Sequence, residues 1–246
     1  MDELRYNAIK KHTISQTILF HLCPGIIQLF VLILLIPPAL HLGFPGSFAD
    51  HLETFIALVP IQIGTLLFIA KKTTETCDIL KLIPFQNKSK LPEYFIFLAV
   101  MIVWAFGIDA VLSPLEDGLR DGLFSFVPDA LAGRDVDLSM FAKNKLIISA
   151  CLGILANGIV APVTEELYFR GYLLPRIDAS PFAAVLLNAI LFSLYHFFSP
   201  WYFFSRLLMM IPLYYWVMKR KNIRFSLAAH IIANTYSSIS VLLDLL

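Results

Sequence analysis

The sequence predicts an all-α membrane protein, a polytopic bundle of about seven transmembrane helices. Two observations carry this prediction. Hydrophobic residues make up 58% of the 246 residues and charged residues only 15%, whereas soluble domains have about 45–50% and about 25%. The apolar residues also come in long runs separated by short charged stretches, a pattern typical of chains that cross a bilayer repeatedly.

Each expected span is a run of about 20 mostly apolar residues, the length needed to cross the hydrocarbon core. The runs cover approximately residues 15–42, 52–70, 92–112, 146–174, 181–198, 202–218 and 226–245. The first run contains Pro24, Pro37 and Pro38 and is long enough to include an interfacial stretch. Because the chain starts with a polar segment and that run is too long for a signal peptide, we expect the first span to be retained.

One integrated membrane domain is expected. Residues 1–145 supply N-terminal helices with loops, and residues 146–246 supply the functional core. The long connection over residues 113–145 is interpreted as a solvated loop. The alternative is that a short amphipathic segment near residues 119–131 forms a lid on the surface. A net charge of +1 gives no basis for nucleic-acid binding, and three isolated cysteines without a CxxC pair predict neither disulfides nor a thiolate metal site.

The distribution of Lys and Arg predicts the orientation, because cytoplasmic loops carry the excess. Fourteen lie in the N-terminal segment and in the three connections on the same side as that segment. The other side has only four, which are Arg120, Arg134, Lys143 and Lys145. The sequence therefore predicts a multi-pass membrane protein with a cytoplasmic N-terminus and an outer C-terminus. A prokaryotic cell membrane is the expected location, although the charge pattern itself does not identify the host.

Ionisable side chains inside the predicted spans are the main functional signal, since each costs roughly 2.5–3.5 kcal/mol to insert. They gather in three segments of the second half of the chain: Glu165-Glu166-Leu167-Tyr168-Phe169-Arg170, Phe192-Ser193-Leu194-Tyr195-His196 and His230-Ile231-Ile232-Ala233-Asn234. A lone buried histidine or a single Glu–Arg pair is usually structural. Acids, histidines and an amide on three helices are hard to explain as packing.

Helical spacing predicts which of these groups share a face. Glu166 and Arg170 are four residues apart and should pair, whereas Glu165 is rotated by about 100° from Glu166. His230 and Asn234 are also four residues apart and should project together.

The helical rise of 1.5 Å per residue predicts the depth of each group. The predicted distance from the cytoplasmic helix ends is roughly 15 Å for Glu165 and Asn234, roughly 22 Å for His196 and roughly 9 Å for His230. All four therefore fall within the hydrocarbon core of about 30 Å. Phe192, one turn before His196, is expected to brace its ring.

At these residues the sequence resembles the CPBP intramembrane protease family, which includes the type II CAAX prenyl proteases and the Abi proteins linked to bacteriocin processing and immunity. The family motifs EExxxR, FxxxH and HxxxN all occur in order, within about residues 146–245. The resemblance implies an intramembrane endopeptidase in which Glu165 and His196 activate a water. It further implies that His230 and Asn234 form an oxyanion hole, with Glu166, Arg170 and Phe192 in support.

The residue types agree with that reaction, which needs a base for water and donors for the developing oxyanion. A metal-free glutamate mechanism without a cofactor is favoured, because the HExxH pattern is absent. The alternative is a Zn²⁺ enzyme with Glu165, His196 and His230 as ligands, since two histidines and a glutamate form a known catalytic zinc set.

The predicted partners are the lipid bilayer and a peptide or membrane-protein substrate, either prenylated or a peptide precursor. Two other functions remain open: a catalytically silent immunity or binding protein of the same family, and a proton-coupled transporter. The intact motifs argue against the first. The absence of two symmetric halves with matched broken helices argues against the second.

Overall fold

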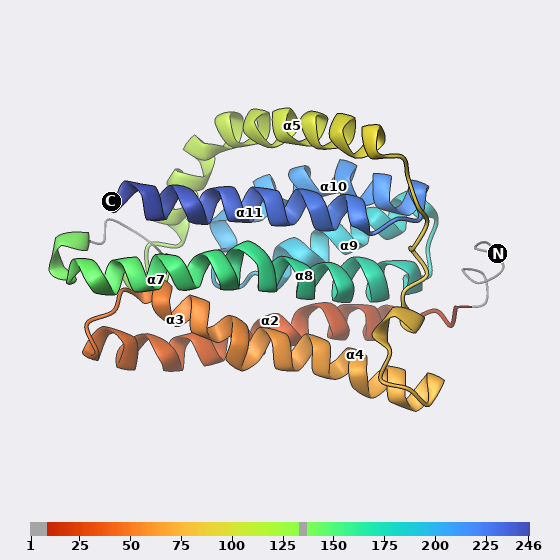
Figure 1. The fold of residues 1–246 in the computed structure, drawn as a ribbon, viewed down its shortest axis with the longest axis horizontal. Helices are drawn as coiled ribbons and strands as arrows, with labels where there is room; N and C mark the ends of the chain where they lie inside the picture. The colour runs from red at the N-terminus through yellow and green to blue at the C-terminus, as the bar shows by residue number, and fades with distance from the viewer. Residues whose placement is uncertain (1–8, 133–136) are drawn as a thin grey trace.

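The computed structural model describes residues 9–132 and 137–246, and over these residues the chain is a bundle of helices without a β-strand. The long helices lie side by side along the longest axis of the molecule (Figure 1). Two isolated β-bridges, His12–Ile177 and Gln86–Asn222, connect segments outside the helices. The predicted all-α fold is confirmed.

Helices make up most of the described chain. In chain order they are α2 (Ile14–His41), α3 (Gly46–Glu53), α4 (Val59–Thr74), α5 (Leu91–Gly118), α6 (Asp129–Ala132), α7 (Lys143–Leu155), α8 (Ala161–Glu165), α9 (Pro181–Tyr195), α10 (Phe203–Arg220) and α11 (Arg224–Asp244). The π-helical segments that continue or join them are η1 (Thr54–Leu58), η3 (Leu119–Leu123), η5 (Ala156–Val160) and η6 (Glu166–Leu173). Short 3₁₀ turns are η2 (Ile79–Leu82), η4 (Leu138–Met140), η7 (Leu174–Arg176) and η8 (Pro200–Tyr202).

Each predicted apolar run corresponds to a helix or to a continuous series of helices. Five helical segments in the described part of the chain are long and apolar enough to cross a membrane, namely Ile14–His41, Gly46–Thr74, Leu91–Leu123, Lys143–Arg176 and Arg224–Asp244. Helix α9 is apolar but shorter, with 15 residues. Helix α10 is amphipathic and carries Arg206 near its start and two basic residues in its last turn. The predicted count of about seven spans is therefore not confirmed.

The connection predicted as a loop over residues 113–145 is more helical than expected. Helix α5 continues to Gly118 and then as η3 to Leu123, and α6 and η4 follow. The helix continues past Pro114, although a proline inside a helix removes a backbone hydrogen bond and crowds the preceding turn. Arg134 in this connection and Arg5 at the N-terminus lie outside the described residues.

The main hydrophobic core takes residues from both halves of the chain. Leu66 of α4 and Phe97 of α5 are buried together with Tyr168, Phe169 and Phe192 from the second half. In contrast, many large apolar side chains of α2 and α5 are exposed, as expected for surfaces that face lipid. The exposed apolar surface follows from the membrane environment rather than from a missing partner.

A glycine sets the distance between α2 and α9. A Cβ atom at Gly25 would lie only 2.1 Å from the backbone oxygen of Tyr195. The residue must therefore lack a side chain for the two helices to pack at this distance. This contact fixes the end of α9, from which His196 follows directly.

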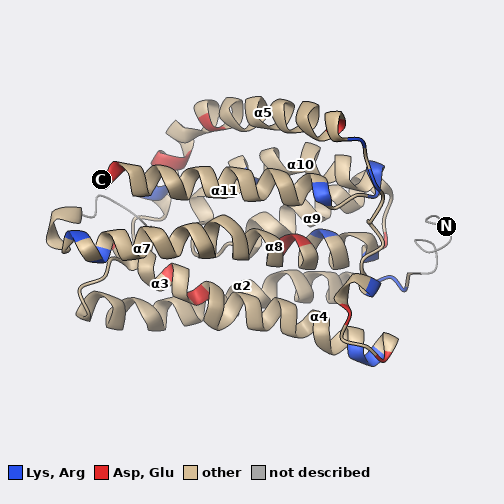
Figure 2. Cartoon of the chain, viewed as in Figure 1, with Lys and Arg blue, Asp and Glu red and all other residues tan. Residues whose placement is uncertain are grey.

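Basic residues gather at one end of the bundle, where α4 ends and α5 and α11 begin (Figure 2). The opposite end, where the C-terminus lies, carries acidic residues and few basic ones (Figure 2). One charge of the predicted asymmetry must be removed from the count, because Arg170 is fully buried and does not belong to a loop.

Candidate active site

The structure brings together Glu165, the last residue of α8, His196, which follows α9, and His230 in the first half of α11. Glu165 Oε1 lies 3.9 Å from His196 Nε2, and Glu165 Oε2 lies 3.9 Å from His230 Nε2. The Glu165 side chain is 7% exposed, so it is largely buried but a small part of its surface remains accessible. The three groups lie closer together than the depths predicted from the helical rise imply.

Both imidazole rings are held by their second nitrogen. His196 Nδ1 donates to the backbone oxygen of Phe192 at 2.8 Å, and His230 Nδ1 lies 3.0 Å from Glu166 Oε1. A carbonyl oxygen and an ionised carboxylate can only accept, so both Nδ1 atoms carry the hydrogen. Each Nε2 atom is then the nitrogen that faces Glu165.

Glu166 and Arg170 form a buried ion pair across one helical turn, as the spacing predicts. Arg170 Nη1 lies 3.3 Å from Glu166 Oε1, and both side chains have 0% exposure. The guanidinium carbon also lies 3.8 Å from the Phe192 ring centre and 3.9 Å from that of Tyr214. The charge of Arg170 is therefore balanced by a carboxylate and by two aromatic faces.

Phe192 supports both parts of the site. Its ring packs edge-to-face against His196 with a centroid distance of 4.7 Å, which confirms the expected contact. Helix α9 ends at Tyr195, however, and not at residue 198 as predicted. His196 is its C-cap, with φ −80° and ψ 60°, so its backbone has already left the helix.

Asn234 shares a helix with His230, but its side chain hydrogen-bonds to Asn157 instead of to either glutamate. Its side-chain nitrogen donates to the backbone oxygen of Asn157 at 3.1 Å and to Asn157 Oδ1 at 3.3 Å. Asn157 Nδ2 in turn donates to Ser238 Oγ at 3.1 Å. The amide expected to face a substrate carbonyl is thus engaged with η5 in this structure.

The helix that carries both glutamates is not the regular α-helix that the sequence predicts over residues 146–174. Helix α8 has only five residues, with the π-helical segments η5 before it and η6 after it. Such π-turns are frequent at functional sites because they change the direction of side chains along a helix. In this chain they lie beside Asn157 and at the Glu166–Arg170 pair.

Arg206 of α10 is a site residue that sequence reasoning left without a role. Its Nη2 donates to Ser199 Oγ at 2.9 Å and its Nη1 to the backbone oxygen of Ser193 at 3.5 Å. The Ser199 amide donates to the backbone oxygen of His196 at 3.0 Å. Arg206 therefore braces the turn that carries His196, and its position inside an apolar run was the available signal.

A second missed group surrounds Tyr195. Its hydroxyl donates to Gln28 Oε1 at 2.8 Å and accepts from Gln62 Nε2 at 2.9 Å. Glu53, at the end of α3, is buried and interacts electrostatically with Glu165 and Tyr195. Polar residues from α2, α3 and α4 thus reach the site, although their sequence segments carry no recognisable motif.

The metal alternative depends on the arrangement of the donors. Glu165, His196 and His230 supply the right atoms, and each histidine has its second nitrogen held, as is usual for metal ligands. Over residues 9–132 and 137–246, however, no group of three or more His, Cys, Asp or Glu side chains is arranged to hold a metal ion. The donors fit zinc in kind, but their spacing does not fit it as they stand.

Comparison with known protein families gives one result. Residues 147–236 match the family described as type II CAAX prenyl endopeptidase Rce1-like. The match contains all three motifs and confirms the resemblance to the CAAX protease family. No match was found among curated proteins or among solved structures.

Proposed function

Residues 147–236 match the Rce1-like type II CAAX prenyl endopeptidase family, and from this premise we propose that the protein is an intramembrane endopeptidase in which Glu165 activates water. The observation that carries the proposal is the position of the Glu165 carboxylate, within 3.9 Å of two histidine Nε2 atoms. At 3.9 Å these atoms are too far apart to hydrogen-bond directly. One water at about 2.8 Å from each partner fits between them.

The proposed reaction begins with Glu165 accepting a proton from water while His196 orients it. The water oxygen forms a bond to the carbonyl carbon of the scissile peptide, and the carbonyl oxygen becomes an oxyanion. Glu165 then returns the proton to the leaving nitrogen as the carbon–nitrogen bond breaks. A carboxylate that acts as base and then as acid completes the hydrolysis without a net change in the enzyme.

The oxyanion requires donors, and α11 is proposed to provide them. His230 Nε2 can donate when it carries a hydrogen, and the carboxylate of Glu166 on Nδ1 supports the charged ring that results. Asn234 would exchange its bond to Asn157 for one to the substrate. Such donors contribute most when they are already fixed in a site that excludes bulk water.

A zinc ion is the alternative means of activating water. Glu165, His196 and His230 would be its ligands, with Phe192 and Glu166 holding the two rings from behind. The ion would supply Lewis-acid chemistry and a more acidic water. The three donor side chains would have to move closer together to hold the ion, because their spacing does not fit it as they stand.

The proposed substrate is a peptide or a membrane-protein segment, either prenylated or a peptide precursor. Glu165 and His230 lie in helical segments long enough to cross a membrane, and His196 follows the shorter apolar helix α9, so the scissile bond is expected to enter the bundle from the bilayer or from its surface. The bilayer is therefore part of the binding environment.

The experiment compares membranes that contain the parent protein, the Glu165→Gln variant or no protein. Peptide mass spectrometry should find cleavage products only with the parent. Glu165→Gln keeps the size of the side chain but removes the base, so inserted protein should be present without products. Equal products from parent and variant would contradict the assignment of Glu165.

A further inference from the structure

An open groove separates the first half of α5 from the first half of α11, on the side of α11 away from the candidate active site. It has a volume of about 630 Å³. Its lining consists of Lys88, Ser89, Leu91, Tyr94, Phe95, Leu98, Arg224, Leu227, Ala228 and Ile231. None of these residues belongs to the proposed catalytic machinery.

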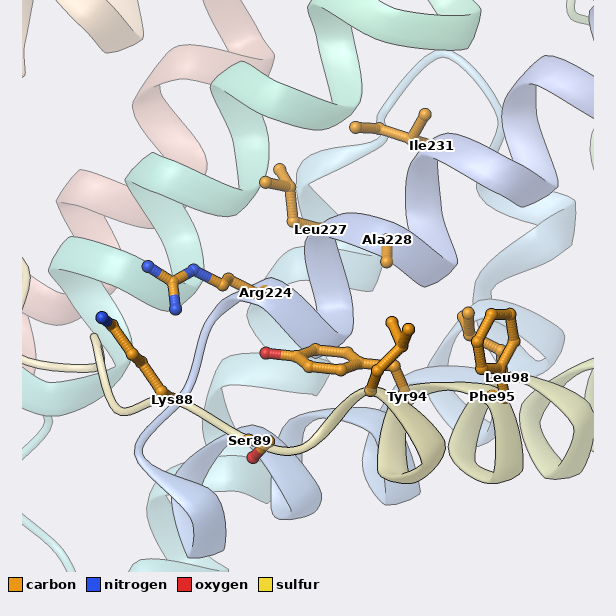
Figure 3. Close-up of a pocket in the computed structure, with 10 residues that line it drawn as sticks. Lys88, Ser89, Tyr94, Phe95, Leu98, Arg224, Leu227, Ala228 and Ile231 are labelled. Carbon is orange, nitrogen blue, oxygen red and sulfur yellow. The ribbon is translucent and has the colours of Figure 1, made fainter.

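The groove has one charged end and one apolar end. Lys88 and Arg224 point toward the same end, whereas Phe95 and Leu98 lie at the other (Figure 3). Both cations are exposed, and within the described part of the chain neither side chain has a carboxylate or another hydrogen-bond partner. The nearby Glu93 is paired instead with Arg220, at 2.6 Å.

Tyr94 forms a fixed wall between the two ends. Its hydroxyl accepts a hydrogen bond from Asn222 Nδ2 at 2.8 Å, and its ring stacks on Phe225 at 4.4 Å. Asn222 and Phe225 are fully buried, so the tyrosine is held from behind. No acceptor for the Tyr94 hydroxyl hydrogen is present among the described residues, which leaves it for a ligand.

From this arrangement we propose that the groove binds one anionic phospholipid. Its phosphate lies against Lys88 and Arg224, and an acyl chain lies along Phe95, Leu98 and Ile231. The charged end is at the basic end of the bundle (Figure 2), where interfacial cations meet lipid headgroups. Basic pockets between transmembrane helices are suited to anionic headgroups, and tyrosine is favoured at the same level of the bilayer.

The lipid would act as a third wall of the groove and hold α5 against α11. The segment Leu91–Leu123, which contains α5, is the least buried of the five candidate spans in the described part of the chain, with 6% of its most apolar stretch buried. A bound lipid contacts both helices at once and therefore stabilises their packing without changing the active site. The proposal concerns binding and does not depend on catalysis.

The test measures lipid retention on the full-length protein by native mass spectrometry, after exchange into detergent with phosphatidylglycerol or phosphatidylcholine. The parent should retain one phosphatidylglycerol with a preference of about thirtyfold, as expected for two cations that each contribute about 1 kcal/mol beside an anionic group. The double variant Lys88→Gln/Arg224→Gln should lose that preference. The matched control Lys72→Gln/Lys219→Gln removes two exposed cations from the same end of the bundle and should keep it.

A second pair of variants tests the apolar end. Ala228→Phe fills the groove without changing charge and should reduce retention of both lipids, whereas Ala99→Phe, on the exposed face of α5, should not. Equal retention of the two lipids by the parent would overturn the proposal. An unchanged lipid preference in Lys88→Gln/Arg224→Gln would also overturn it. If that variant retained the lipid and had a higher KM for a peptide substrate, the groove would be assigned to the substrate instead.

Discussion

The adjacent residues Glu165 and Glu166 have different surroundings, and we assign them different roles for that reason. Glu166 is fully buried and is paired with Arg170 and His230. Glu165 is not within hydrogen-bond distance of either cationic group and instead faces the Nε2 atoms of two histidines at the longer distance of 3.9 Å. A carboxylate already engaged with a cation is a poor base, so the water-activating role is proposed for Glu165.

At the residue scale, the sequence predicted contacts between residues one helical turn apart but did not predict contacts between residues far apart in the chain. The spacing of four residues identified the Glu166–Arg170 pair, because residues on one helical face are fixed by local geometry. The bond from Asn234 to Asn157 joins positions 77 residues apart and depends on how α11 packs on η5. No local pattern contains that information.

Metal dependence can be tested on the same residues. We predict that activity in detergent survives strong chelators, because Asn234 is an amide suited to donating and no set of described residues is arranged around an ion. The measurement is the cleavage rate before and after chelation, with a chelated zinc peptidase as control. Loss of activity that returns on adding zinc would make Glu165, His196 and His230 ligands.

At the scale of elements, the packing of α11 on η5 sets the position of His230 and Asn234. A Cβ atom at Gly158 would lie 3.1 Å from Thr235 Oγ1 and 3.3 Å from Thr235 Cα. This is a tight approach to a backbone atom, which cannot move without shifting the helix. Thr235 Oγ1 also donates to the backbone oxygen of Gly158 at 3.0 Å, so the two elements are held as well as close.

We therefore predict that Gly158→Ala lowers the cleavage rate per folded molecule by roughly tenfold or more, since small displacements of catalytic groups have large effects on rate. Gly107→Ala is the matched control, because a Cβ atom there would meet nothing within 4 Å. Rates should be compared with thermal melts of both variants. Activity of Gly158→Ala equal to that of Gly107→Ala would show that the α11–η5 distance is unimportant.

The existence of the long helices was predictable, and their irregularities were not. Apolar run length is a strong local signal, and every predicted run appears as helix. The π-turns on either side of α8 and the end of α9 at Tyr195 have no counterpart in the apolar pattern, whereas contacts between helices distant in the sequence occur at the end of α9. Gly25 against Tyr195 is one such contact, and its partner cannot be identified from either segment alone.

At the scale of the whole molecule, the charge distribution predicts how the bundle sits in the membrane. Basic residues gather where α4 ends and where α5 and α11 begin, and the C-terminus lies at the other end (Figures 1 and 2). We predict that a reporter fused after Leu246 is external, because basic ends remain in the cytoplasm. A cytoplasmic reading would contradict the orientation, with a reporter in the connection over residues 76–90 as the internal control.

The central claim is that Glu165 is the base and Glu166 is a structural partner, and one comparison tests it most directly. The measurement is the cleavage rate per folded molecule for Glu165→Gln and Glu166→Gln, together with a thermal melt of each. Glu165→Gln should melt like the parent and lose about three orders of magnitude or more in rate, as is typical when a catalytic base is removed. Glu166→Gln leaves Arg170 without its carboxylate, which typically costs about 3–5 kcal/mol, and it also weakens the support of the His230 ring, so it should melt earlier and lose less rate per folded molecule than Glu165→Gln. A Glu166→Gln protein that melts like the parent but is inactive, beside a Glu165→Gln protein that still cleaves, would contradict the account.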